Sequence, residues 1–134
     1  MKVKHLLLGY GIFAILLFLY TGYTLQQGFP HLYDNDIIIR YQYRANHVYL
    51  LFSGLLILLY ASTYRKSNSP YVNRLNIIIM FIIILAHILL IAAFYIEPLQ
   101  ASENRPLSFY GIVCNIVAVV LAVFTSLSQQ ESGW

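Results

Sequence analysis

The chain has 134 residues, of which 60% are hydrophobic and only 10% are charged. A soluble domain usually carries about 25% charged residues, so the composition argues against one and predicts a single integral membrane domain over residues 1–134. Because so few residues are charged, we interpret the net charge of +3 as basic residues that orient the chain in the bilayer and contact anionic lipid. We do not expect nucleic acid as a partner. The single cysteine, Cys114, permits no internal disulfide.

The first predicted element is a transmembrane helix over about residues 6–25. It follows a basic start with Lys2 and Lys4, and it is long enough to cross a hydrocarbon core of about 30 Å. The start resembles a signal peptide, but the apolar run is too long for one and no A-x-A site follows it. We therefore predict a retained helix, followed by a polar loop over residues 26–35.

The second predicted helix begins at Asp36, with Asp34 or Asn35 as its N-cap, and crosses the membrane over about residues 45–64. Its first turns place Arg44 and His47 on one face, near the membrane surface. Two interpretations stay open. The arginines either anchor the helix at the lipid headgroups, or Arg44 and His47 belong to a site, since ionisable groups are costly near lipid.

The third and fourth predicted spans cover about residues 76–96 and 107–127. Ser69-Pro70 is typical of an N-cap followed by a first helical residue. Glu97-Pro98 is expected to end the third helix, because the residue before a proline disfavours the α region. Pro106 is then expected to begin the fourth helix.

One face of the fourth predicted helix is made mainly of small residues, which permit close contact between membrane helices. This face consists of Gly111, Asn115, Ala118, Ala122 and Thr125. Asn115 is its exception, because an unpaired amide inside the membrane costs several kcal/mol. We therefore expect Asn115 to have a hydrogen-bond partner.

The basic residues of the connections predict the orientation. Five lie at the N-terminus and in the second connection, namely Lys2, Lys4, Arg65, Lys66 and Arg74. Three lie in the first and third connections, namely Arg40, Arg44 and Arg105. Short connections also favour antiparallel neighbours. The predicted fold is therefore all-α, an up-down-up-down four-helix bundle with both termini in the cytoplasm.

All four predicted helices bring hydrogen-bonding side chains to the end of the bundle that faces away from the cytoplasm, which we call the outer end. Glu97 should lie there at the depth of Arg44 and His47, so we expect an ion pair between Glu97 and Arg44. The candidate ligand-binding residues are Arg44, His47, Glu97, Arg105 and Asn115. A structural tie and a ligand pocket both remain open, because ionisable residues inside membranes are often functional.

The histidines do not predict a haem. A haem held by two histidines needs them at similar depth on facing helices, whereas His47 and His87 should differ in depth by roughly 12 Å at 1.5 Å per residue. We expect no cofactor. His87 is expected to be a neutral imidazole bonded to Asn115 or to a tyrosine, with a proton relay as the alternative.

Metal and catalytic motifs are not recognised either. His31, Asp34 and Asp36 could hold a divalent metal together with His47, but their spacing matches no motif, so no metal site is predicted. The sequence has no glycine-rich phosphate loop, no G-x-S-x-G and no H-E-x-x-H. An enzyme is therefore not the favoured interpretation.

Three segments carry a resemblance: Arg44-Ala-Asn-His47, Phe94-Tyr-Ile-Glu97-Pro98 and Arg105-Pro106-Leu107. They resemble positions in uncharacterised small four-helix inner-membrane proteins of bacteria, over the last three predicted helices. The resemblance implies the bacterial inner membrane and no function.

The function we expect is that of a non-enzymatic accessory or assembly subunit of a larger membrane complex. Its partners would be the lipid bilayer and other membrane subunits or copies of itself. The alternative is a small-molecule site at the outer end, for a lipid headgroup, a quinone or a similar ligand, with redox chemistry as one possibility.

Overall fold

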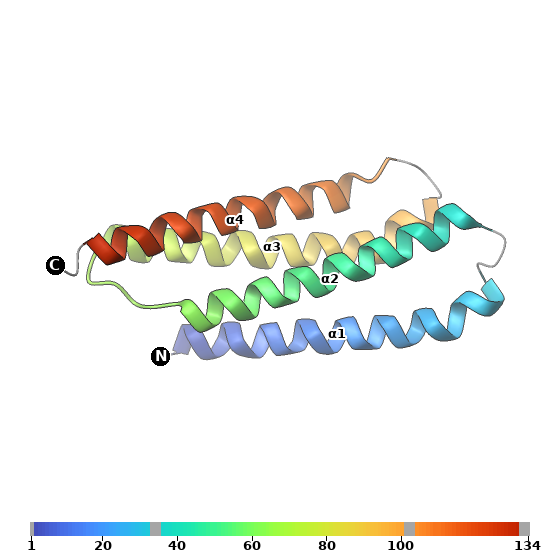
Figure 1. Ribbon diagram of the computed structural model, residues 1–134, viewed down its shortest axis with the longest axis horizontal. Coiled ribbons are helices and arrows are strands. Elements are labelled where there is room, and N and C mark those ends of the chain that lie inside the picture. The colour runs from blue at the N-terminus through green and yellow to red at the C-terminus, as the bar shows by residue number, and fades with distance from the viewer. Residues whose placement is uncertain (1, 33–35, 101–103, 132–134) are drawn as a thin grey trace.

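The computed structural model describes residues 2–32, 36–100 and 104–131, with side chains for residues 3–28, 36–100 and 104–128. The described chain forms four helices (Figure 1): α1 (Lys2–Leu32), α2 (Ile37–Thr63), α3 (Pro70–Gln100) and α4 (Pro106–Glu131). Each helix is long and apolar enough to cross a membrane. The predicted all-α class, with four candidate transmembrane helices, is confirmed.

Two helix starts follow directly from the sequence. Asp36 caps α2, because its carboxylate accepts hydrogen bonds from the backbone N–H groups of Ile38 at 3.0 Å and Ile39 at 3.1 Å. The sequence predicted a helix beginning at Asp36 with Asp34 or Asn35 as its cap, so the observed helix begins one residue later and Asp36 itself is the cap. Asp34 and Asn35 lie outside the described residues. Pro70 is the first residue of α3, as predicted, since proline has no N–H to leave unpaired in the first turn.

Two helix ends differ from the predictions. α1 continues through most of the segment predicted as a polar loop and ends at Leu32. α3 passes through Glu97 and Pro98 and ends at Gln100. Proline removes one backbone donor and weakens a helix without always ending it, and neighbouring side chains satisfy the affected turn in membrane proteins. Pro98 leaves the Phe94 carbonyl without its helical donor, and the Asn46 amide of α2 donates to the preceding carbonyl, that of Ala93, at 2.8 Å.

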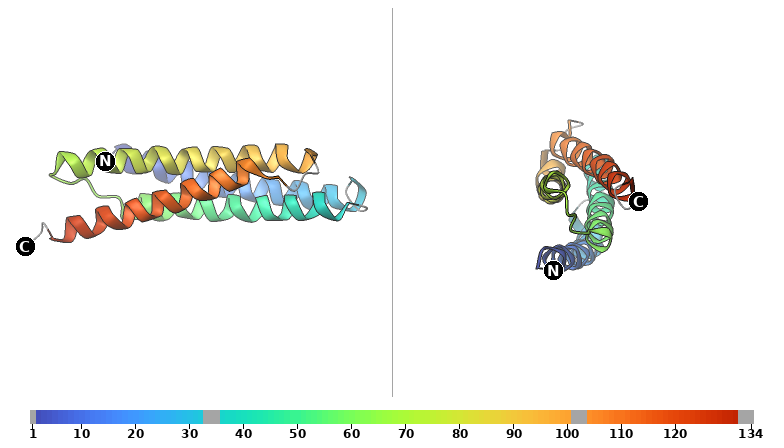
Figure 2. Two further views of the ribbon diagram at one scale, coloured as in Figure 1. Left: turned by 90° about the horizontal axis from the view of Figure 1, so that it is seen from above. Right: turned by 90° about the vertical axis from the view of Figure 1, so that its left-hand side faces the viewer.

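Consecutive helices run in opposite directions (Figure 1). We call the end that holds the α1–α2 and α3–α4 connections the polar end, and the end that holds the α2–α3 connection the basic end. α2 is central and lies against α1, α3 and α4, whereas the described residues of α1 and α4 make no backbone contact with each other. The end-on view of Figure 2 shows the result, an open curved row with α1 and α4 at its edges, in place of a closed bundle.

The small face of α4, which the sequence predicts to allow close helix contact, packs against α3 at Gly111. Gly111 and Ala118 are buried, and a Cβ added to Gly111 would lie 2.8 Å from the Leu90 side chain. Glycine at this position therefore lets the two helices approach closely near the polar end. Ala118 continues the contact deeper in the membrane, in a core that also includes Ile83 of α3 and Ile57 of α2.

Candidate functional site

A group of buried polar side chains gathers at the polar end, where α2, α3 and α4 meet. It consists of Asn46 of α2, Glu97 of α3, Ser108 of α4 and Arg105, which immediately precedes α4. We call it the polar cluster. Asn46 is 0% exposed, Glu97 2% and Ser108 3%. The Arg105 side chain is 17% exposed, so the guanidinium is the part of the cluster nearest the surface.

Glu97 holds the beginning of α4 in place. Its Oε2 pairs with Arg105 Nε at 3.4 Å, and its Oε1 accepts from the Ser108 backbone N–H at 2.8 Å. Ser108 is in the first turn of α4, where backbone N–H groups have no partner inside the helix and the helix dipole is positive. A carboxylate from α3 thus acts as a cap for α4, directly after Pro106, which has no N–H to satisfy.

Asn46 joins α2 to the same cluster. Its Nδ2 donates to Ala93 O at 2.8 Å and contacts Glu97 Oε2 at 3.4 Å. Its Oδ1 accepts from the Ser108 hydroxyl at 2.8 Å and from the Arg105 guanidinium. The Ser108 hydroxyl also contacts Glu97 Oε2, and with one proton it can serve only one of these two acceptors at a time. These buried groups therefore satisfy one another and tie three helices together.

Arg44 lies away from the polar cluster. It is exposed and borders a shallow hollow with Ile37, Arg40 and Tyr41, whereas Glu97 is buried. Among the described residues, the ion pair of Glu97 is with Arg105, so the expected pair with Arg44 is wrong. The reason is helical phase: Asn46 points toward α3, and Arg44, two residues earlier, is turned by about 200° around the helix.

His47 belongs to the contact between α1 and α2. Its Nδ1 lies 3.1 Å from the Thr21 hydroxyl, and its ring stacks on Phe18 with 4.1 Å between ring centroids. A Cβ added to Gly22 would come within 3.0 Å of His47 Cε1, so the glycine leaves room for the imidazole. His47 thus fastens α1 to α2 and does not join Glu97 and Arg105.

Asn115 and His87 lie deeper in the helices. Asn115 Oδ1 accepts from the Ser53 hydroxyl at 3.5 Å, whereas its Nδ2 has no partner in the described part of the chain. His87 is fully buried, with its ring edge-on to Tyr10 at 5.7 Å between centroids. Neither ring nitrogen of His87 has a hydrogen-bond partner among the described residues, so the expected bond to Asn115 or a tyrosine is wrong.

The two membrane histidines contact α1 at different depths. His87 meets Tyr10 and His47 meets Phe18, which are separated along α1 by about 12 Å at 1.5 Å per residue. This is the depth difference that the sequence predicts. Within residues 3–28, 36–100 and 104–128, no three metal-ligating side chains gather. The side chains of His31 and Asp34, considered as metal ligands, lie outside the described residues.

The candidate residues therefore separate into four places. Glu97 and Arg105 meet, His47 lies at the α1–α2 contact, Asn115 lies deeper, and Arg44 is on the exposed side of α2. Asn46 and Ser108 complete the cluster, and the candidate set did not include them. For Ser108 the sequence did offer a signal, because this residue follows Pro106 by two residues at a predicted helix start.

The chain matches no protein-family model, no curated protein and no solved structure. The interpretation of the polar cluster therefore depends on its geometry and chemistry.

Proposed function

We propose that the protein is a non-enzymatic accessory or assembly subunit of a larger membrane complex. The observation that supports this best is the closed state of the polar cluster. Its buried amide, carboxylate and hydroxyl hydrogen-bond to one another and to helix backbone. Such a cluster fixes the relative positions of α2, α3 and α4, which suits a scaffold better than a site of chemistry.

We place the contact with a partner on the far face of α1. This helix packs on α2 through buried residues such as Leu7 and Ala14, and it exposes Leu16 and Tyr20. A Cβ added to Gly9 would meet no atom within 4 Å, so the glycine leaves a shallow notch in this helix. Small residues let a neighbouring membrane helix approach closely.

Photo-crosslinking in native membranes tests the subunit proposal. A photoreactive amino acid at Leu16 or Tyr20 is expected to give one heavier adduct of defined mass with a protein partner. The same group at Phe81 or Leu85, on the exposed face of α3, serves as the matched control and is expected to give mainly lipid adducts. If all of these positions yield lipid adducts alone, and the protein purifies without a partner in mild detergent, the subunit proposal fails.

For the threading, we propose an up-down-up-down path through the bacterial inner membrane with both termini in the cytoplasm. The basic end carries Lys4, Arg65, Lys66 and Arg74, whereas the polar end carries the three arginines Arg40, Arg44 and Arg105 together with the carboxylates of Asp36 and Glu97. An excess of lysine and arginine marks the cytoplasmic side of a membrane protein.

Reporter fusions test this threading. A reporter after Trp134 is expected to be active in the cytoplasm, and one inserted within residues 99–105 is expected to be active outside it, because α4 separates the two points. Both alkaline phosphatase and a fluorescent protein serve as reporters, since they are active on opposite sides. Equal localisation of the two fusions would contradict a fourth span.

One observation favours the alternative function, a small-molecule site at the polar end. A hollow of about 390 Å³ lies beside the polar cluster, lined by Asn104, Arg105, Pro106, Phe109 and Tyr110. The Arg105 guanidinium borders it and lies 5.8 Å from the centre of the Tyr49 ring. The purified protein separates the two functions: a quinone or lipid retained in stoichiometric amount, detected by absorption and mass spectrometry, would favour the alternative.

A further inference from the structure

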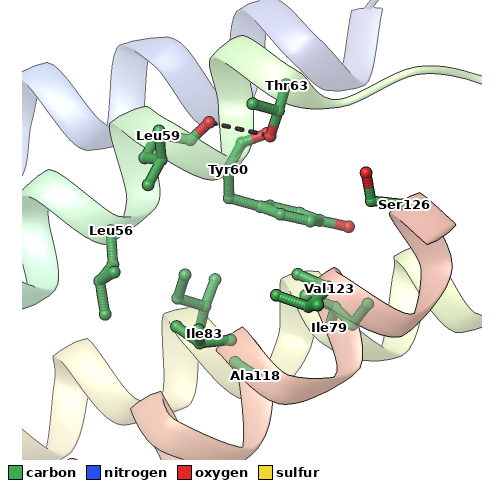
Figure 3. A pocket seen from close by; sticks show the side chains of 11 residues that line it. Leu56, Leu59, Tyr60, Thr63, Ile79, Ile83, Ala118, Val123 and Ser126 are labelled. Atoms are coloured by element: carbon green, nitrogen blue, oxygen red, sulfur yellow. Dashed lines mark hydrogen bonds between the residues drawn. The ribbon is translucent and has the colours of Figure 1, made fainter.

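A second feature lies at the other end of the molecule, in a cavity between α2, α3 and α4. Its volume is about 250 Å³ (Figure 3). α2 and α4 are joined near the middle of their lengths by the hydrogen bond from Ser53 to Asn115, and the cavity lies on the basic side of this contact. The small side chains Ala118 and Ala122 of α4 leave the space open. Its apolar wall comes from Leu56, Leu59, Ile79, Ile83, Val119 and Val123.

The cavity changes character toward the basic end. It shares Tyr60, Thr63, Ala122 and Ser126 with a smaller hollow that is also lined by Arg65, Asn76 and Thr125. An apolar slot therefore opens into a mouth of hydroxyl and amide groups with one guanidinium. We call the whole feature the basal groove.

Among the side chains that the structure describes, the charged groups around the mouth are all basic. Arg65 is exposed at the mouth, and Lys66 and Arg74 are exposed nearby in sequence. The carboxylates among the described side chains, Asp36 and Glu97, are both at the polar end. An apolar slot with a basic mouth complements an amphiphile that has a hydrocarbon chain and a negatively charged head.

We propose that the basal groove binds one acyl chain of an anionic phospholipid, with the lipid phosphate at Arg65. The size of the groove favours an acyl chain over a drug-sized ligand or a helix of a partner protein. The apolar slot of the groove has a volume of about 250 Å³, which is below the range of about 300–1,000 Å³ that is typical for the sites of drug-sized ligands. A partner helix, about 10–12 Å across with its side chains, is too wide for the slot. This proposal does not depend on the proposed subunit function.

The experiment compares lipids added to the purified, delipidated full-length chain in a neutral detergent. Phosphatidylglycerol is expected to raise the thermal unfolding midpoint by several degrees, because it binds the folded state, and phosphatidylcholine is expected to do so only at higher concentration. Arg65→Gln should weaken the response to phosphatidylglycerol by about fivefold, as expected for one basic contact with an anionic surface. Arg44→Gln, at the polar end, is the matched control and should respond like the wild type.

Substitutions in the slot test the acyl chain separately. Ala122→Phe should abolish the rise in midpoint, whereas Val120→Phe, on the exposed face of α4, should leave it intact. Ser126→Phe, at an exposed position of the lining, serves if Ala122→Phe does not fold. An equal rise with both lipids, an undiminished rise in the filled variants, or a rise with glycerol 3-phosphate alone would overturn the proposal.

Discussion

Replacing Glu97 by glutamine is expected to destabilise the folded protein by about 3–5 kcal/mol, because it leaves a partly buried guanidinium without its carboxylate. Glu97 pairs with Arg105 at 3.4 Å and is 2% exposed, so water cannot replace the lost charge easily. The substitution also weakens the cap that Glu97 provides to the Ser108 N–H. The thermal unfolding midpoint in detergent measures the loss.

A double-mutant cycle then isolates the pair. Glu97→Gln together with Arg105→Gln should recover much of the stability, because no lone charge remains in the polar cluster. The matched cycle combines Glu97→Gln with Arg44→Gln, whose side chain is exposed on α2. That cycle should be additive to within about 0.5 kcal/mol, since an exposed arginine away from the cluster does not share the carboxylate. Additive effects in the Arg105 cycle, or strong coupling in the Arg44 cycle, would contradict the arrangement described here.

The helices were predictable because the hydropathy of about twenty consecutive residues adds up to one clear signal for a membrane span. A long apolar run can hardly be anything other than a membrane span, and the start of α3 at Pro70 depends only on neighbouring backbone groups. Glu97 and Arg105 were predicted at the same end for a similar reason, since both border the α3–α4 connection. Each of these features depends on residues that are close in sequence.

The partner of Glu97 was not predictable in the same way. The ion pair with Arg44 required the correct depth and also the correct rotation of α2, and an error of two residues turns a side chain by about 200°. Hydropathy sets the depth of a helix well, whereas the rotation depends on packing with helices distant in sequence. Asn46 shows this, because its position facing Ala93 and Glu97 is set by the contact between α2 and α3.

The continuation of α3 through Pro98 and the open row of helices are also set by tertiary contacts, so the sequence did not predict them. Pro98 weakens α3 locally, but it is buried beside a carboxylate that is held by α2 and α4, and the helix continues for two further residues, to Gln100. Short connections do favour antiparallel neighbours, as predicted, yet they do not require the first and last helices to meet. Whether α1 meets α4 is decided by side-chain packing along the whole length of the helices.

Replacing His87 by leucine is expected to stabilise the protein by a net of about 0.5–1.5 kcal/mol. The imidazole is fully buried and neither ring nitrogen has a partner among the described residues, and a buried group left without a hydrogen bond costs about 1–3 kcal/mol. Leucine keeps an apolar side chain in contact with Tyr10 and gives up the edge-on ring contact, which is worth about 0.5–1.5 kcal/mol. The thermal unfolding midpoint in detergent is expected to rise.

His47→Leu is the control, and its expected effect on the stability of the folded protein is opposite to that of His87→Leu. That imidazole lies within hydrogen-bond distance of the Thr21 hydroxyl and stacks on Phe18, so its loss should destabilise the α1–α2 contact by about 1–2 kcal/mol. A loss of stability in His87→Leu would instead mean that the folded protein satisfies the buried imidazole, with an internal water or a proton-carrying group near Tyr10. The proton-relay interpretation of His87 would then be favoured, because a satisfied, fully buried imidazole in a membrane helix is the arrangement that such a relay needs.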